Sequence, residues 1–227
     1  MTPAASDTPA RPRCIAIMKA QRLELDAWGV VFCGGASRRM GRDKALLELD
    51  GRSLVARAAA ALAEVAPRVL LASGSAPRYA ELGLECVLDS TAGTGPLAGL
   101  AAALERVERE RVPWLLALAC DMPSVSGEVF RALHERARSE RADACLVATR
   151  RAGSVADDVE PLLAVYSAAV LPAVRAALAR GEHRLNAFHG DVRIARLALV
   201  ELGPRFADCA RNLNTPRDFL EAGGRLE

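Results

Sequence analysis

The sequence predicts an α/β protein with a Rossmann-like three-layer α/β/α fold and a mainly parallel, doubly wound sheet. From Trp28 onward, short apolar segments alternate with longer segments of helical spacing, which is the pattern of parallel strands connected by helices. Of the 227 residues, 51% are hydrophobic, so a core large enough to cover both faces of such a sheet is available.

Each element of the first two thirds has its own local signals. The predicted strands are short apolar runs, at residues 29–33, 68–73, 85–88, 114–120 and 144–149. Helices are predicted between them at residues 53–66, 77–82, 95–109 and 126–140. Pro67 ends the first helix, and Gly95-Pro96 begins the third, because proline is tolerated in a first helical turn.

The last third is less regular. It predicts a strand at 162–166, a helix at 168–180, one or two strands within 192–202, and a closing helix at 215–222. Residues 28–227 are expected to form a single domain. Residues 1–27 are expected to be a disordered N-terminal extension, since its proline-rich start is typical of disorder and translation could begin at Met1 or Met18.

Composition and charge exclude several classes of function. Thirty Lys and Arg residues against 28 Asp and Glu give a net charge of +2, so neither a nucleic acid nor an anionic membrane is expected as a partner. The longest apolar run, residues 112–120, is too short to span a bilayer. Six cysteines without CxxC or zinc spacing predict reduced thiols in a cytoplasmic protein.

A glycine-rich loop, residues 34–44, follows the first predicted strand. Glycines let the backbone approach a ligand closely, so that successive N–H groups can hold phosphate oxygens. The loop has neither the Walker A nor the G-x-G-x-x-G pattern, and a basic surface loop is the alternative interpretation. Its candidate nucleotide-binding residues are Gly34, Gly35, Ser37, Arg38, Arg39, Gly41 and Lys44.

Lys44 stands out by composition. Of the 30 basic residues, two are Lys and 28 are Arg, which indicates that arginine serves wherever a surface charge is enough. A lysine kept in this loop suggests a need for a compact ammonium, placed against the phosphates to stabilise charge as pyrophosphate leaves. Chance placement is the alternative.

Further candidates lie where predicted strands end, the edge at which open α/β sheets bind ligands. The carboxylate of Asp121 suits Mg²⁺, which takes one or two carboxylates together with substrate phosphates; a cap for the following turn is the alternative. Asp89 could accept hydrogen bonds from a base or sugar, or cap a turn. The helix start after it offers free N–H groups to the same cleft or is a simple Gly-Pro start, with candidates Gly95, Pro96, Leu97 and Gly99.

Near the C-terminal end, Asn212 and Asn214 could present both amides to a ligand. Alternatively, Asn214 or Thr215 caps the closing helix. The three histidines show no spacing toward a Ser or Cys partner, so a nucleophilic triad has no support. His134 is expected to be solvated on a charged helix face.

In this order, the motifs resemble the molybdenum cofactor guanylyltransferase family. The resemblance runs from about Trp28 to Phe219. Many nucleotidyltransferases share the glycine-rich loop, whereas the Gly-Pro-Leu-Ala-Gly turn at 95–99 and the Asn-Leu-Asn-Thr-Pro segment at 212–216 are narrower features, as is Glu160-Pro161-Leu.

The resemblance implies a nucleotidyltransferase that moves GMP from Mg-GTP to the terminal phosphate of molybdopterin, releasing pyrophosphate and forming the guanine dinucleotide cofactor. Transient contact with molybdoenzymes or their chaperones is a further expectation. Two alternatives stay open. One is a related nucleotidyltransferase that uses CTP or another phosphorylated acceptor, and the other is a non-catalytic nucleotide- or cofactor-binding module.

The resemblance also implies roles for individual residues. Lys44 contacts the GTP phosphates, Asp121 binds Mg²⁺, and the backbone of Cys33, Gly34 and Gly35 holds the nucleotide. Asp89 falls on the nucleoside side, while the pterin side is expected at Arg39, Gly95, Pro96, Asn212 and Asn214. Two departures from the family pattern are Phe32-Cys33 in place of Leu-Ala, and Ala72-Ser73 in place of an asparagine that contacts the nucleoside.

Overall fold

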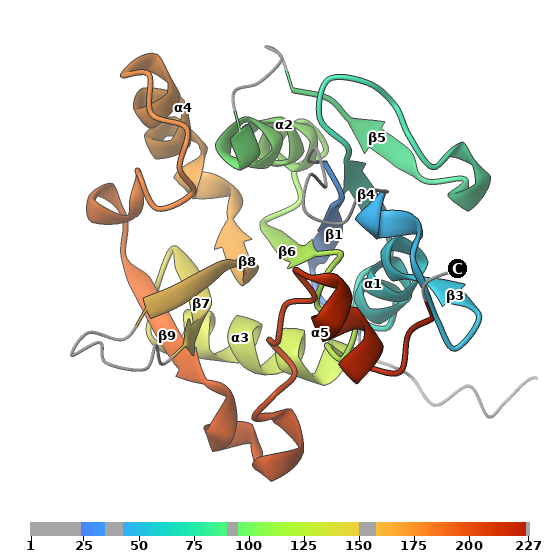
Figure 1. Cartoon of the computed structure of the whole chain (residues 1–227). Coiled ribbons are helices and arrows are strands. Elements are labelled where there is room, and N and C mark those ends of the chain that lie inside the picture. The colour runs from blue at the N-terminus through green and yellow to red at the C-terminus, as the bar shows by residue number, and fades with distance from the viewer. Residues whose placement is uncertain (1–23, 35–42, 90–94, 150–157, 226–227) are drawn as a thin grey trace, which may run out of the picture.

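The computed structural model describes residues 24–34, 43–89, 95–149 and 158–225. Its centre is a seven-stranded sheet in the order β5-β4-β1-β6-β8-β7-β9 (Figure 1). Neighbouring strands pair in parallel, except that β8 runs antiparallel to both β6 and β7. The strands are β1 (Ala27–Phe32), β4 (Val69–Ala72), β5 (Glu85–Val87), β6 (Trp114–Ala119), β7 (Ala144–Thr149), β8 (Asp158–Ser167) and β9 (Ile194–Ala198).

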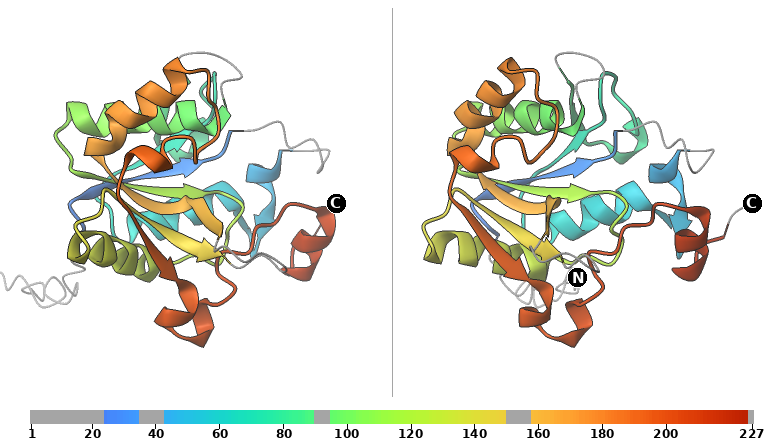
Figure 2. Two further views of the ribbon diagram at one scale, coloured as in Figure 1. Left: turned by 90° about the vertical axis from the view of Figure 1, so that its left-hand side faces the viewer. Right: turned by 60° about the vertical axis from the view of Figure 1, so that its left-hand side comes forward.

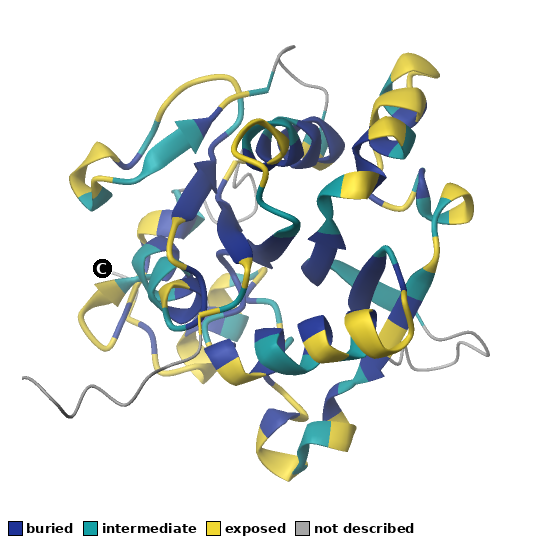
Figure 3. Ribbon diagram, turned by 180° about the vertical axis from the view of Figure 1, so that it is seen from behind, coloured by how far each residue is buried: buried dark blue, intermediate teal, exposed yellow. Residues whose placement is uncertain are grey.

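Helices cover both faces of the sheet, so the predicted three-layer arrangement is confirmed. α1 and α3 pack on one face, and α2 and α4 on the other, as the edge-on views in Figure 2 show. Each layer turns its buried residues toward the sheet and its exposed residues outward (Figure 3). The helices are α1 (Leu54–Ala63), α2 (Gly95–Arg109), α3 (Gly127–Ser139), α4 (Leu171–Ala179) and α5 (Pro216–Glu221). Among the described residues, no helix is long and apolar enough to cross a membrane.

The observed bounds match the expected ones for α2 and β7 and differ elsewhere. Within 192–202 there is one strand, β9, followed by a 3-10 helix, Leu199–Leu202. The helix expected at 77–82 is a single 3-10 turn, Ala80–Leu82, and the one expected at 168–180 begins with a 3-10 turn, Ala168–Val170. Such short turns contain too few residues to show a helical period. The sequence pattern therefore could not distinguish a 3-10 turn from an α-helix.

A small hairpin and a 3-10 turn after the glycine-rich loop were not predicted. η1 (Lys44–Leu46) leads into β2 (Glu48–Leu49) and β3 (Arg52–Ser53), which pair antiparallel. Asp50 and Gly51 both have positive φ, 51° and 71°, as a tight two-residue turn requires. Strands of two residues are too short to show alternation. The hairpin, η1 and α5 all lie beyond the carboxyl ends of β1 and β6, the ends marked by the arrowheads in Figure 2.

The expectation that His134 is solvated was wrong. Its side chain is buried on α3, where its ring packs edge-on against Trp114 with centroids 5.2 Å apart. Burial lowers the pKa of His134 and favours the neutral form. The charged neighbours in sequence lie on the other faces of the same helix, so composition around the residue did not reveal which way it points.

Candidate active site

The candidate site lies at the carboxyl edge of the sheet, beside the point where the strand order reverses. From β1 the chain proceeds outward through β4 to β5 and then crosses to β6 on the other side of β1. In open α/β sheets a ligand crevice forms at this reversal. The Cys120 N–H donates to the Phe32 carbonyl at 3.1 Å, so the segments that follow β1 and β6 leave the sheet side by side.

Lys44 and Asp121 meet directly in this crevice. The Lys44 Nζ lies 2.5 Å from the Asp121 Oδ2 and 3.2 Å from the Asn214 Oδ1. The side chains of Lys44 and Asp121 are 19% and 13% exposed, so the pair is shielded from water on most sides. Three residues from distant parts of the chain therefore form one charged centre.

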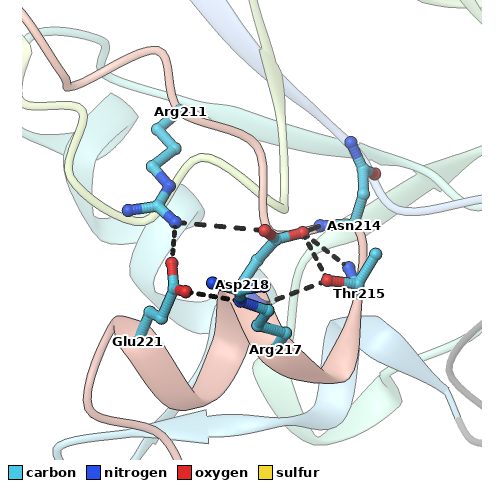
Figure 4. Close-up of polar contacts among 6 residues, drawn as sticks. All are labelled: Arg211, Asn214, Thr215, Arg217, Asp218 and Glu221. Carbon is cyan, nitrogen blue, oxygen red and sulfur yellow. Dashed lines mark hydrogen bonds and ion pairs between the residues drawn. The ribbon is translucent and has the colours of Figure 1, made fainter.

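The C-terminal segment 212–215 is fixed against this centre by its backbone. The Leu213 N–H donates to the Asp121 carbonyl at 2.9 Å. The Leu213 side chain is buried in a small apolar cluster with Leu47, Leu49, Leu54 and Phe219. Thr215 caps α5, while its N–H and that of Asn214 donate to the Asp218 carboxylate (Figure 4). Thr215 is thus the N-cap of α5, and the Asn214 side-chain oxygen accepts a hydrogen bond from Lys44.

At the end of β1, close backbone packing favours glycine at position 34. The N–H groups of Cys33 and Gly34 both donate to the Ala72 carbonyl at 3.1 Å. A Cβ on Gly34 would lie 3.1 Å from the Gly74 nitrogen and 3.2 Å from the Ser73 carbonyl carbon, so a larger residue would have to displace this backbone by a few tenths of an ångström. The Cys33 thiol points into the core, and burial raises its pKa to about 12, so it is not a nucleophile at neutral pH.

Four of the predicted binding residues, Phe32, Ala72, Asp89 and Gly99, converge from different elements. A Cβ built on Gly99 of α2 would lie 3.3 Å from the Phe32 ring, 3.5 Å from the Ala72 Cβ and 3.5 Å from the Asp89 Oδ1. Burial raises the pKa of Asp89. Glycine at position 99 therefore lets α2 pack closely against Phe32, Ala72 and the Asp89 carboxylate.

The remaining predicted residues include one that does not face the site and several that lie outside the described residues. Leu97 is fully buried in the core beneath α2, so its side chain does not face the site. Gly95 has φ 73° and approaches the backbone of His183, and Pro96 is exposed beside it. Gly35, Ser37, Arg38, Arg39 and Gly41 lie outside the described residues.

A polar pocket of about 670 Å³ opens at the ends of β7 and β8 and was not anticipated. The Glu160 Oε1 accepts from the Leu162 N–H at 3.1 Å. Burial raises the pKa of Glu160, and hydrogen bonds from Leu162 and the Asn212 side chain oppose that rise. The walls include Thr149, Glu160, Leu185, Asn186, His189 and Asn212. Of these residues, Asn212 was predicted as a binding residue, and Glu160 was noted only as part of a family motif without an assigned role.

The segment 212–214 connects the pocket to the charged centre. Asn212 lines the pocket and bonds Glu160, whereas Asn214 bonds Lys44. Leu213 between them is anchored to Asp121. Two side chains two residues apart thus serve adjoining sites.

Comparison with known proteins finds relatives over most of this chain. Residues 29–194 match the MobA-like NTP transferase domain. A probable molybdenum cofactor guanylyltransferase from Pelotomaculum thermopropionicum is 36% identical over 87% of this chain and 92% of its own. A molybdenum cofactor guanylyltransferase from Rhodopseudomonas palustris is 33% identical over 85% and 90%, respectively.

Solved structures share the fold. The molybdopterin-guanine dinucleotide biosynthesis protein A of Archaeoglobus fulgidus superposes with a TM-score of 0.67 at 22% identity, over 86% of this chain and 96% of that one. A 2-C-methyl-D-erythritol 4-phosphate cytidylyltransferase from Thermus thermophilus gives 0.60 at 20% identity, over 85% and 95%. Proteins named for different reactions therefore share this fold.

Fold and site together define a nucleotidyltransferase, with the charged centre at the carboxyl edge of a mostly parallel sheet. The chain belongs to the MobA-like NTP transferase family.

Proposed function

We propose that the protein transfers GMP from Mg-GTP to the terminal phosphate of molybdopterin and releases pyrophosphate. The observation that carries this proposal is the Lys44–Asp121–Asn214 centre at the carboxyl edge, in a chain whose relatives over most of its length are molybdenum cofactor guanylyltransferases. Residues 28–227 are proposed to act as one catalytic domain.

The reaction is an in-line displacement at the α-phosphorus of GTP. A phosphate oxygen of the acceptor forms the new P–O bond, and the bond from the α-phosphorus to the bridging oxygen breaks as pyrophosphate leaves with the electron pair. Because the acceptor phosphate is already anionic, no general base is needed. Lys44 supplies positive charge to the phosphates, and the segments after β1 and β6 orient them, so positioning and electrostatics provide the rate.

The residues at the centre fit Mg²⁺ bound together with a substrate. Within the described ranges, no group of three or more His, Cys, Asp or Glu side chains could hold a metal. One carboxylate, Asp121, and one amide oxygen, Asn214, are hard oxygen donors, and Mg²⁺ commonly takes one or two carboxylates and completes its shell with phosphates and water. When bound, the ion supplies charge neutralisation at the phosphates. Asp121 is proposed to hold it.

The nucleoside is proposed to lie beside Asp89, which would accept hydrogen bonds from it. The acceptor is proposed to occupy the pocket at β7 and β8, across the segment 212–214 from the charged centre. A pterin ring presents an amino group and a ring N–H side by side, and a carboxylate such as that of Glu160 accepts from both.

Glu160→Gln tests the acceptor pocket. It keeps the size of the side chain and an acceptor for Leu162 but removes the charge. We expect KM for molybdopterin to rise roughly 10-fold or more, since hydrogen bonds to charged groups contribute about 1.5–3 kcal/mol, while KM for GTP stays unchanged. Glu105→Gln on the exposed face of α2 is the matched control. An equal rise in both KM values would contradict the assignment.

Nucleotide preference tests the proposed reaction itself. Pyrophosphate release is measured with each of the four nucleoside triphosphates and Mg²⁺, with and without molybdopterin. We expect release with GTP that depends on molybdopterin. Preference for CTP would favour the cytidylyl alternative, and binding of GTP without release would favour a non-catalytic module.

The proposed surroundings follow from the substrates. The five cysteines in the described residues are free thiols, which suits a reducing compartment, and we propose the cytoplasm as the location. Contact with molybdoenzymes or their chaperones stays a prediction.

A further inference from the structure

We propose that Tyr79 and Asp43 form a clamp that sets the position of Lys44, which makes Tyr79 a positioning residue for the transfer reaction. The proposal rests on the role proposed above for Lys44. It concerns two residues that no sequence motif connects, because Tyr79 lies on the connection between β4 and β5 while Asp43 ends the glycine-rich loop.

Asp43 fixes the start of the turn that carries Lys44. Its Oδ1 accepts from the Ala45 N–H at 3.2 Å, so Asp43 is the N-cap of η1. A capping side chain fixes the direction in which the first turn leaves the loop. Because Lys44 is the first residue of η1, the orientation of the Asp43 carboxylate determines where the lysine side chain begins.

Tyr79 in turn fixes the Asp43 carboxylate. Its hydroxyl lies 3.0 Å from the Asp43 Oδ2 and 3.2 Å from both the Asp43 Oδ1 and the Cys33 carbonyl. Tyr79 is only 6% exposed; its contact with the Cys33 carbonyl is buried, and its contacts with Asp43 are partly buried. The hydroxyl therefore lies between the end of β1 and the end of the glycine-rich loop.

Arg78 completes the clamp. Its guanidinium pairs with the Asp43 Oδ2 and lies over the Tyr79 ring, 5.0 Å from the centroid. The Asp43 carboxylate thus receives a backbone N–H, a hydroxyl and a guanidinium from three directions. A carboxylate bonded in this way has little freedom to rotate. Because Asp43 caps η1, its bonds also restrict the orientation of η1.

The backbone of Tyr79 adopts an energetically unfavourable conformation in this arrangement. Tyr79 has φ 59° and ψ 44°, in the left-handed region, where a bulky side chain is rare. Such conformations persist where surrounding contacts determine them, and they concentrate at functional sites. Burial and the bond to Asp43 raise the pKa of Tyr79, so the hydroxyl keeps its proton and remains a donor at neutral pH.

Tyr79→Phe removes the hydroxyl and keeps the ring. We expect kcat to fall about 10- to 100-fold, as for a reacting group displaced by a fraction of an ångström to an ångström, with a smaller change in KM for GTP. In a Lys44→Ala background the same substitution is expected to change the remaining rate less than about twofold, because contributions made through one shared residue are not additive. Equal loss in both backgrounds would overturn the proposal.

Lysine NMR gives a readout that does not need turnover. The chain has two lysines, Lys19 and Lys44, so the side-chain ε-carbon signal of Lys44 is assigned by its loss in Lys44→Ala. We expect Tyr79→Phe to shift or broaden that signal. Tyr166→Phe removes another buried tyrosine hydroxyl, which bonds the Pro161 carbonyl at 2.8 Å, and is expected to leave the signal unchanged.

A second variant, Asp43→Asn, tests the clamp if Tyr79→Phe does not fold. Asp43→Asn keeps an N-cap oxygen for Ala45 but removes the charge that holds Arg78, and it is expected to move the Lys44 signal as well. If neither variant moves the signal, the clamp does not position Lys44. If the wild-type protein releases no pyrophosphate but the signal moves, the clamp stands and the proposed function fails.

Discussion

Replacing Lys44 by arginine is expected to lower kcat about 10²- to 10³-fold, the loss that follows removal of one preorganised charge-stabilising donor. The substitution preserves the charge, so the loss comes from geometry. A guanidinium pairs with a carboxylate through two parallel hydrogen bonds. Because Lys44 already lies 2.5 Å from Asp121, an arginine there would hold that carboxylate through its fork and point less charge at the phosphates.

Pyrophosphate release under saturating GTP and molybdopterin measures this effect. Lys19→Arg, which changes the other lysine of the chain in the same way, is the matched control and should retain wild-type activity. A near-normal rate for Lys44→Arg would mean that any cation suffices at this position, and the scarcity of lysine in the sequence would then carry no functional meaning.

Asp121→Asn is expected to lower kcat about 10³-fold or more while changing stability little. An amide is a poor substitute for a carboxylate toward Mg²⁺, which takes hard, charged oxygen ligands. The asparagine still offers an oxygen to the Lys44 ammonium, so the fold loses only part of one interaction. A loss of about 1 kcal/mol lowers the Tm of a chain of this size by about 2–4 °C.

Two measurements separate the roles of Asp121. Titration with Mg²⁺ at fixed GTP should show that the variant binds the nucleotide with little dependence on the metal, whereas the wild-type protein binds it more tightly as Mg²⁺ rises. Thermal unfolding should show the small change in Tm. A large drop in Tm with activity retained would mean that Asp121 is a structural partner of Lys44 and not the metal ligand.

The acceptor pocket shows why some site residues escape sequence inspection. Glu160 is one of 28 acidic residues, and no spacing connects it with Asn186 or His189. These residues become neighbours only because β8 runs antiparallel between β6 and β7 and the segment after α4 returns beside the start of β8. An antiparallel strand in a mostly parallel sheet leaves no local mark in the residues that form it.

The sequence by itself determined the fold class and the residues at the strand ends. Apolar periodicity and proline and glycine positions depend on local physics, so the alternation of strands and helices was readable along the chain. The glycine-rich loop, Asp89 and Asp121 could be assigned to one edge because parallel strands place their carboxyl ends together.

Only the tertiary structure decided how these residues act on one another. The contacts of Lys44 with Asp121 and Asn214, and of Asp43 with Tyr79, join residues 77, 170 and 36 positions apart. Distances of about 3 Å between such residues depend on strand order, on crossover paths and on the packing of the C-terminal segment through Leu213. These are collective properties of the folded chain. Composition could single out Lys44, but only the tertiary structure identified the residues that it contacts.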